Sequence, residues 1–249
     1  MNPGPHATTC RVLHHDQWVL AVEKPSGHLS HPNRETEGAG RCAFEGPYDE
    51  AERRFDSPAG PVWLVHRLDR GTSGVLLAAL DETSAARCRA SFEQGAVEKR
   101  YVALVAGLLP PQGLWKDALE ETRARSAVRV KVRPGAPPNA ESRFQVLASS
   151  RPLNLSLLDI GILTGRTHQI RVQAAFRNHP LLGDDVYGDF GLNHWARREL
   201  GLRRLFLHAA SLALPHPATG RPLALTAPMP EELLAVLEKL RFRLPGTKS

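Results

Sequence analysis

The chain has 249 residues, of which 42% are hydrophobic and 23% are charged. That length supports one sizeable core, or a main domain with a small lobe. The formal net charge of +6 favours a polyanionic partner such as nucleic acid, although a basic protein without such a partner has the same composition. No run approaches the ~18 apolar residues of a membrane-spanning helix, which excludes that class of protein.

The cysteines indicate the compartment. Cys10, Cys42 and Cys88 are an odd number and form no CxxC pair, which argues against a disulfide framework and a zinc ribbon and fits a reducing cytosol. The amino terminus has no apolar segment that could serve as a signal peptide. We therefore expect a cytoplasmic protein, and a monomer. The histidines between residues 14 and 31 match no common zinc spacing, so we expect no metal.

Strands and polar loops dominate the prediction for the first half of the chain. In order, we expect a loose leader (1–10), a short β unit ending in a Pro-Ser-Gly turn (11–27), a polar surface loop with one short helix around 49–55 (33–60), two apolar strands on either side of a charged turn (62–65 and 75–80), a helix (82–94) and a strand (101–109). A loop as long as 33–60 is usually functional or mobile.

The second half has the same character. We expect an irregular basic segment (112–140), two paired strands (143–149 and 153–163), a helix (166–178), a turn-rich stretch (179–189), a short helix (195–200), a strand (205–214) and a final helix that Pro230 begins (230–242). The connections are too short for repeated βαβ units. The sequence therefore predicts an α+β fold with a mainly antiparallel sheet.

The densest group of reactive side chains is HRLDRGTSG at residues 66–74, between two apolar runs. Asp69 has Arg67 and Arg70 as neighbours, and their charges would keep its carboxylate ionised, as a nucleophile or base requires. The glycines allow a sharp turn and the close approach of a ligand. The alternative is a salt-bridged strand connection in which Asp69 caps a turn.

Two further segments could carry chemistry. If GRTHQIR (165–171) is helical, Thr167 and Arg171 share a face and Arg171 could reach a carboxylate on the sheet; an exposed polar helix face is the alternative. Lys99 and Arg100 precede Tyr101 at the start of a strand. The tyrosine could stack on a base and the cations could meet phosphate, although half-buried packing is the commoner role of such a tyrosine.

The order of these segments resembles the RluA-like family of pseudouridine synthases. The resemblance covers about residues 11–228 and rests on EKPSG (23–27) followed by His-Pro (31–32), HRLDRGTSG (66–74), KRYVALVAG (99–107), GRTHQIRV (165–172), HPLLGDDVYG (179–188), LHAASLAL (207–214) and HPATG (216–220). It implies an isomerase that converts a specific uridine of structured RNA to pseudouridine without a cofactor. It also implies a bent, mainly antiparallel sheet with flanking helices and a central catalytic cleft.

The resemblance also implies roles for single residues. Asp69 matches the catalytic aspartate, Tyr101 the tyrosine that packs against the target uracil, and Arg171 the basic residue that pairs with the aspartate. Arg67 matches a position that helps to fill the space left by the extruded nucleotide. Further RNA contacts are expected from Arg70, Lys99, Arg166 and His168. We expect residues 11–249 to form a single catalytic domain without an amino-terminal RNA-binding module.

The RNA is harder to predict than the reaction. Residues 188–210 are similar to the subgroup that includes tRNA pseudouridine synthase C, which favours tRNA over ribosomal RNA. Without a separate RNA-binding module, the domain would hold RNA through two basic clusters, each of which could equally be a solvated face. They are Arg123, Arg125, Arg129, Lys131 and Arg133, and Arg197, Arg198, Arg203 and Arg204.

Two other functions fit part of the pattern. A glycosidase or nucleosidase could use one ionised aspartate, but such enzymes usually need two carboxylates. We expect Asp184 and Asp185, which lie in a turn, to order the chain there. The second is an RNA-binding protein that keeps the fold without catalysis. The intact HRLD segment, Tyr101 and Arg171 argue against it. Release of free uracil would support the first, and RNA binding without uridine conversion the second.

Overall fold

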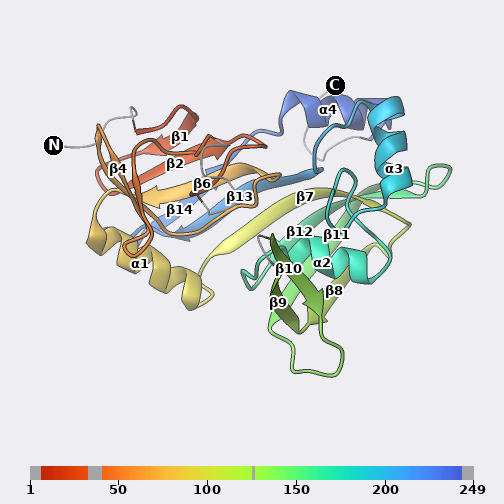
Figure 1. The fold of residues 1–249 in the computed structure, drawn as a ribbon, viewed down its shortest axis with the longest axis horizontal. Helices are drawn as coiled ribbons and strands as arrows, with labels where there is room; N and C mark the ends of the chain where they lie inside the picture. The colour runs from red at the N-terminus through yellow and green to blue at the C-terminus, as the bar shows by residue number, and fades with distance from the viewer. Residues whose placement is uncertain (1–6, 33–40, 125–126, 243–249) are drawn as a thin grey trace. The chain divides into compact units, whose positions relative to one another are not determined.

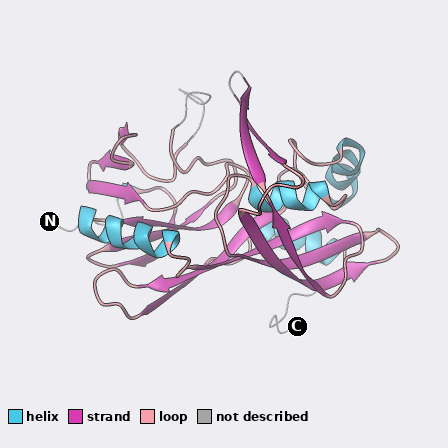
Figure 2. Cartoon of the chain, turned by 90° about the horizontal axis from the view of Figure 1, so that it is seen from below, coloured by secondary structure: helices cyan, strands magenta, loops and turns pink. Residues whose placement is uncertain are grey.

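The computed structural model describes residues 7–32, 41–124 and 127–242. The chain divides into two compact units. The first comprises Met1–Lys99 and Ala209–Pro228, and the second comprises Arg100–His208 and Met229–Ser249. Each unit consists mainly of strands, with few helices (Figure 1, Figure 2). No helix among the described residues is long and apolar enough to cross a membrane.

Among the described residues of the first unit, a sheet is accompanied by one α-helix, α1 (Glu82–Glu93). Its strands lie in the order β3-β4-β5-β6-β13, with β2 pairing both β1 and β6 and with β14 pairing β13. Their bounds are β1 (Arg11–His15), β2 (Val19–Lys24), β3 (Tyr48–Asp49), β4 (Arg54–Ser57), β5 (Gly60–Leu64), β6 (Ser73–Ala79), β13 (Leu207–Pro215) and β14 (Pro222–Thr226).

The centre of this unit is the antiparallel pair of β2 and β6, in register from Val19 opposite Ala79 to Lys24 opposite Gly74. All seven residues of β6 are buried. Asp81 caps the start of helix α1, because its carboxylate accepts hydrogen bonds from the amide and hydroxyl of Ser84. Two side chains of α1, Ala85 and Cys88, join the apolar core of this sheet. The helix and the sheet thus hold the ends of the β5–β6 connection in place.

The second unit has a four-stranded order, β7-β12-β11-β8, and a separate hairpin, β9 with β10. The helices pack around them, and α4 joins a core that includes Leu104, Leu157 and Phe206. The bounds are β7 (Glu98–Ala106), β8 (Gln112–Asp117), β9 (Leu119–Ala124), β10 (Ala127–Val132), β11 (Ala140–Ser150), β12 (Leu155–Ile162), α2 (Gln169–Phe176), α3 (Phe190–Trp195), the π-helix η2 (Ala196–Leu200) and α4 (Glu231–Lys239).

The predicted α+β fold with a mainly antiparallel sheet is confirmed. Every strand pair whose register is defined is antiparallel. The expected strand pair over 143–149 and 153–163 is β11 with β12, and the final helix begins directly after Pro230. The bend of the sheet and its central cleft stay expectations from the resemblance.

The prediction of a loop with one helix over residues 33–60 was wrong where the structure describes that segment. Residues 41–60 contain β3, β4 and the start of β5. The helix expected around 49–55 is a tight turn, because the Asp49 carboxylate accepts hydrogen bonds from the amides of Ala51 and Glu52 and Arg53 adopts a left-handed backbone (φ 55°). Residues 33–40 lie outside the described residues.

Residues 112–140 were wrongly predicted to be irregular. They contain β8, β9 and β10. Val128, Val130 and Val132 alternate with cations and pack toward Leu119 and Val172 in a small core. This period of two is typical of a strand with one buried face, and the high content of charge, glycine and proline around it obscured the pattern.

The helix expected over 166–178 is shorter, since α2 spans Gln169–Phe176. His168 has a left-handed backbone (φ 53°), and the Gln169 side-chain oxygen accepts from the Arg166 amide at 3.0 Å. Thr167 therefore lies outside the helix, and the idea that Thr167 and Arg171 share a helical face was wrong.

Candidate active site

The backbone on both sides of Asp69 is fixed by hydrogen bonds within the first unit. Asp69 lies in the connection between β5 and β6, residues 65–72, which we call the reaction loop. The Asp69 carbonyl accepts from the Thr72 amide at 3.0 Å, closing a tight turn. Buried Leu68 donates its amide to the Ser30 hydroxyl oxygen, and that hydroxyl donates to the Leu68 carbonyl, both at 2.9 Å. The half-buried carboxylate of Asp69 therefore starts from a defined position.

A buried lysine ties the EKPSG segment to the reaction loop. Lys24 is fully buried, and its ammonium donates to the carbonyls of Pro25 (3.0 Å), His28 (2.7 Å) and Arg70 (3.3 Å). Burying an ammonium is costly unless such acceptors surround it. The Gly27 amide donates to the Arg70 carbonyl at 2.8 Å, and the Arg70 guanidinium donates back to the Gly27 carbonyl at 3.2 Å. These contacts set the backbone next to Asp69.

The start of β6, directly after the reaction loop, needs a glycine. Gly74 has φ +119°, and a Cβ there would lie 2.1 Å from the Ala209 carbonyl oxygen. No other residue permits both that backbone and that approach of β13. The last glycine of the HRLDRGTSG motif is thus explained by the packing of β6 against β13.

His66 supports the loop as a neutral ring. Its Nε2 accepts from the Leu77 amide at 2.9 Å, and the ring stacks on Phe92 at 5.0 Å between centroids. Burial lowers the pKa of His66 to about 3, and the charges of Lys99 and Arg53 act in the same direction. The Lys99 ammonium lies 5.7 Å from the centre of the Phe92 ring, and burial lowers its pKa.

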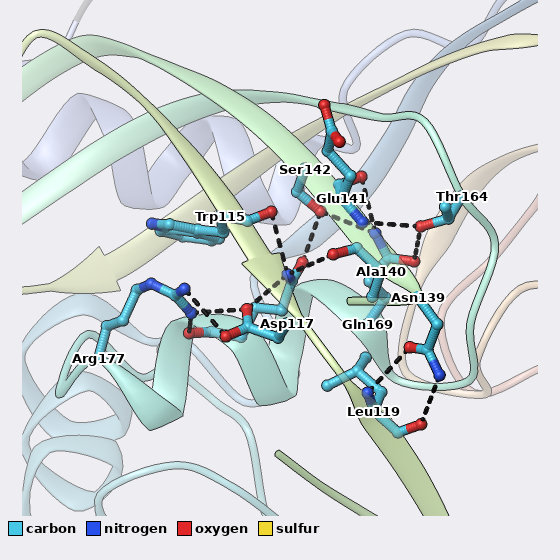
Figure 3. Close-up of polar contacts among 11 residues, drawn as sticks. Trp115, Asp117, Leu119, Asn139, Ala140, Glu141, Ser142, Thr164, Gln169 and Arg177 are labelled. Carbon is cyan, nitrogen blue, oxygen red and sulfur yellow. Dashed lines mark hydrogen bonds and ion pairs between the residues drawn. The ribbon is translucent and has the colours of Figure 1, made fainter. Parts of the chain in front are cut away.

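In the second unit, helix α2 is anchored through one polar face (Figure 3). Asp117 receives a bidentate pair of hydrogen bonds from Arg177 and one from Gln173 at 2.7 Å. Gln169 donates to the Glu141 carbonyl and to the Ser142 hydroxyl. Residues 169, 173 and 177 are four apart and share a face. Arg171 lies about 200° around the helix from residue 169 and so projects from the opposite side.

Arg171 forms a buried ion pair with Asp184 on that side. Its Nε and Nη2 donate to the two carboxylate oxygens of Asp184, each at 2.8 Å, and the side chains are 9% and 1% exposed. The guanidinium carbon also lies 5.2 Å from the centre of the Tyr187 ring. One edge of the guanidinium is therefore held in a single orientation.

The acidic partner is itself held by the turn that contains it. Asp184 accepts from the amides of Val186 and Tyr187 at 2.9 and 3.1 Å. Burial raises the pKa of Asp184. The hydrogen bonds and charge of Arg171, together with those two amides, lower it by a larger amount, so the pKa lies below its ordinary value. Asn193 of α3 accepts from the Gly183 amide at 2.7 Å and donates to the Asp184 carbonyl at 2.9 Å.

The other predicted site residues are spread over both units. Tyr101 is buried in β7, at 8% exposure. The Nδ1 of His168 lies 2.9 Å from the Tyr187 hydroxyl, and the exposed Arg166 donates to the Asn139 carbonyl at 3.2 Å. In the first unit, exposed Arg67 contacts the ring of His31.

Sequence reasoning missed Asp184 and Tyr187 as partners of Arg171. The HPLLGDDVYG motif contained both residues, and the expectation that Asp184 orders its turn is borne out by its two amide contacts. Asp184 is also the buried counter-charge of Arg171, a contact between α2 and the turn after it that the local sequence pattern does not predict. An acidic residue beside a glycine in an otherwise apolar turn was the available signal.

Of the two basic clusters, the second needs a correction. Arg204 is not a free RNA contact, because its guanidinium donates to Glu232 and to the carbonyls of Leu205 and Leu207, and its side chain is 12% exposed. Its neighbours Arg197, Arg198 and Arg203 are exposed. In the first cluster Arg129, Lys131 and Arg133 are exposed, whereas the side chains of Arg123 and Arg125 lie outside the described residues.

Comparison with known proteins identifies relatives over almost the whole chain. Residues 18–176 match the RNA pseudouridylate synthase family. The chain is 36% identical over 235 residues to the ribosomal large subunit pseudouridine synthase C of Vibrio vulnificus (strain CMCP6), covering 92% of this chain and 69% of that one. It is 33% identical over 241 residues to the tRNA pseudouridine synthase C of Salmonella typhi, covering 93% and 90%.

The fold matches solved structures as well. Human RNA pseudouridylate synthase domain containing 4 superposes with a TM-score of 0.69 at 25% identity, covering 94% of each chain. Human RNA pseudouridylate synthase domain containing 1 superposes with a TM-score of 0.68 at 23% identity, covering 95% of this chain and 90% of that one. Both superpositions show the same fold.

Proposed function

The chain belongs to the RluA-like family of RNA pseudouridine synthases, and from that premise we propose that Asp69 is its essential carboxylate and that tRNA is its substrate. As an isomerase of this family it converts uridine in RNA to pseudouridine. The observation that carries the role of Asp69 is the construction of the reaction loop. The Leu68 carbonyl accepts from the Ser30 hydroxyl, the Arg70 carbonyl accepts from the Lys24 ammonium, and the Thr72 amide donates to the Asp69 carbonyl. The backbone that carries the one carboxylate of the loop therefore has a fixed course.

The reaction requires no net change in atoms or electrons. The bond from N1 of uracil to the sugar C1′ breaks, the base rotates, and a bond from C5 to C1′ forms; N1 gains a proton and C5 loses one. We assign to Asp69 the attack on the sugar or base, or the removal of a sugar proton. The target must leave the RNA stack to expose this bond. Tyr101 would pack against the uracil.

The guanidinium of Arg171 supports a role as an oriented hydrogen-bond donor. Because Asp184 supplies a buried counter-charge and holds the Nε–Nη2 edge, the guanidinium of Arg171 has a fixed orientation and would act as a directed donor. This refines the simple expectation that Arg171 keeps a carboxylate ionised by its charge alone. Arg67, Arg70, Lys99, Arg166 and His168 remain our candidates for contacts to the RNA.

The choice of tRNA rests on residues 188–210. In this stretch Asp189 caps α3, Asn193 orders the turn before it, and Arg197 and Arg198 are exposed on η2. The similarity to a synthase of tRNA points the same way. Ribosomal RNA is the second candidate, because the similarity to a synthase of the ribosomal large subunit is of the same size.

Pseudouridine mapping distinguishes the two substrates. Total tRNA and ribosomal RNA from a strain that lacks the gene would be incubated with the purified protein, labelled with carbodiimide and read by primer extension. A new stop in tRNA alone supports the proposal. A new stop in ribosomal RNA alone replaces tRNA with the second candidate, and the absence of any stop with a folded protein contradicts both.

A further inference from the structure

Tyr187, the tyrosine of the HPLLGDDVYG motif, lies where three segments of the second unit meet. It contacts β10 and two residues of the GRTHQIR motif, His168 and Arg171. We propose that Tyr187 is a positioning residue for the isomerisation, which acts through its hydroxyl on His168 and through its ring on Arg171. The inference rests on the proposed function, in which His168 contacts the RNA and Arg171 is a directed donor.

The Tyr187 hydroxyl connects β10 to the start of α2. Its oxygen accepts from the Val130 amide at 2.9 Å and lies 2.9 Å from Nδ1 of His168. Burial raises the pKa of Tyr187, so the hydroxyl keeps its hydrogen at neutral pH. Of these two partners the Val130 amide can only donate, so Nδ1 accepts the hydroxyl hydrogen. In the neutral imidazole, Nε2 then carries the ring hydrogen and is a donor.

His168 takes this contact in a left-handed backbone. Its φ is 53° and its ψ is 22°, a region that residues other than glycine seldom adopt. As the N-cap residue of α2 it makes no side-chain capping hydrogen bond, whereas Asp81 and Asp189 cap α1 and α3 with their carboxylates. Its imidazole instead meets the Tyr187 ring edge to face, with 5.5 Å between centroids. Such a strained residue, whose side chain does not serve its own helix, indicates a functional contact.

The main chain of His168 does not depend on Tyr187. The side chain of the next residue, Gln169, accepts from the Arg166 amide at 3.0 Å and donates to the Glu141 carbonyl at 3.0 Å. The backbone at the start of α2 is thus held from β11. Tyr187 holds the imidazole alone, so its hydroxyl can be removed without unfolding the segment.

The ring of Tyr187 supports the second residue. The guanidinium carbon of Arg171 lies over this ring, 5.2 Å from its centre, while Asp184 binds Nε and Nη2. The carboxylate holds one edge of the guanidinium, and the ring adds a cation–π contact that limits its tilt. The ring itself packs against the core of Val130 and Val172, where β10 and α2 lie side by side (Figure 1).

The two contacts use different parts of one side chain, so substitutions separate them. The test measures steady-state conversion of total tRNA or ribosomal RNA, whichever the wild type modifies, from a strain that lacks the gene. Tyr187→Phe removes only the hydroxyl, and we expect KM to rise about fivefold while kcat stays close to that of the wild type. Tyr187→Leu removes the ring as well, and we expect kcat to fall about fivefold in addition.

Tyr48→Phe is the matched control for the loss of a tyrosine hydroxyl. Tyr48 contacts His31 and Phe55 through its ring, which this change keeps, so both kinetic constants should equal those of the wild type. A Tyr187→Phe protein with unchanged KM would overturn the role of the hydroxyl. Equal kcat values for Tyr187→Phe and Tyr187→Leu would overturn the role of the ring.

A double variant shows whether the hydroxyl acts through His168. His168→Asn suits the left-handed backbone and keeps an acceptor near the place of Nδ1, but it has no counterpart of Nε2. We expect it to raise KM about as much as Tyr187→Phe, and the two changes together to raise KM no further. A merely structural role of Tyr187 predicts additive losses and a lower melting temperature with KM unchanged, which would contradict the proposal.

The outcomes separate this inference from the function beneath it. If the wild type converts uridine and Tyr187→Phe has the same KM as Tyr48→Phe, the positioning role is wrong and the synthase assignment stands. If the wild type converts no uridine in tRNA or ribosomal RNA, the proposed function fails and the positioning role fails with it.

Discussion

Arg171 of helix α2 and Asp184 form a buried, bidentate ion pair with both donor–acceptor distances at 2.8 Å. The pair connects the GRTHQIR and HPLLGDDVYG motifs, which are separate in the sequence. It turns Arg171 from a free cation into an oriented donor whose charge is already matched. Any role of Arg171 in catalysis therefore depends on Asp184.

The first prediction concerns this pair. Asp184→Asn keeps the side-chain size but leaves a buried guanidinium without its counter-charge, which should lower the free energy of unfolding by about 3–5 kcal/mol. Urea denaturation measures it. The exposed neighbour offers a control, since Asp185→Asn should change the same quantity by less than about 0.5 kcal/mol. Equal effects at the two positions would contradict the ion pair.

The pKa of Asp184 adds a pH dependence. Because Arg171 and two amides hold this pKa below its ordinary value despite burial, the contribution to stability is present above the unfolded value of about 3.9 and is lost as the pH falls below it. The difference in free energy of unfolding between wild type and Asp184→Asn should therefore shrink steadily as the pH falls below about 3.9. A constant gap between them would show that the carboxylate charge is not the cause.

A second prediction concerns the dependence of stability on pH that His66 causes. Its pKa of about 3 in the folded protein lies below the unfolded value of about 6.5, so the folded protein gains stability above the unfolded value and loses it progressively from about pH 6.5 toward 3. His66→Gln keeps an acceptor for the Leu77 amide but cannot titrate, and should flatten this slope. His194→Gln, at an exposed histidine, should leave the slope as it is in the wild type.

Lys24 should matter for catalysis because it holds the backbone next to Asp69. Lys24→Met has a similar volume but leaves the carbonyls of Pro25, His28 and Arg70 without their shared donor. We expect a loss of about 3 kcal/mol or more in stability, and a fall in kcat larger than the rise in KM, because the Arg70 carbonyl is next to Asp69. Lys116→Met, at an exposed lysine, is the control. A stable Lys24→Met protein with normal kcat would refute the role.

Two glycines near the reaction loop form a matched pair. Gly27 and Gly74 both have positive φ, but a Cβ at Gly27 meets nothing within 4 Å, whereas at Gly74 it meets the Ala209 carbonyl at 2.1 Å. Gly27→Ala should cost about 1 kcal/mol from the backbone alone, and Gly74→Ala should cost several times more because β6 or β13 must move. Thermal unfolding of both variants gives the comparison, and similar melting temperatures would contradict it.

The sequence was sufficient where local patterns decide the structure. The apolar runs at 62–65 and 75–80 predicted β5 and β6, and the spacing of residues 82–94 predicted α1 almost to the residue. The two-residue strand β3 has no pattern of its own, and only its pairing with β4 defines it. The turn from Asp49 to Arg53 resembles the first turn of a helix in composition, so its tight geometry was not foreseen.

The candidate site shows the same division. The HRLD motif located Asp69 because reactive residues gathered between apolar strands. The partners of Lys24 and Arg171 were beyond local reasoning, since both side chains are satisfied by main-chain carbonyls or by a carboxylate that only the folded chain brings near. Residue type determines which contacts a side chain can make, while tertiary packing determines which partner it binds.

The most direct test of the central claim compares the wild type with Asp69→Asn in a single-turnover conversion assay on the RNA that mapping identifies. The substitution keeps the shape of the side chain and removes its charge. The account predicts that Asp69→Asn folds, binds the RNA with an affinity close to that of the wild type and forms no detectable pseudouridine, while Asp185→Asn converts normally. Conversion by Asp69→Asn at the wild-type rate would contradict the assignment of Asp69 as the essential carboxylate.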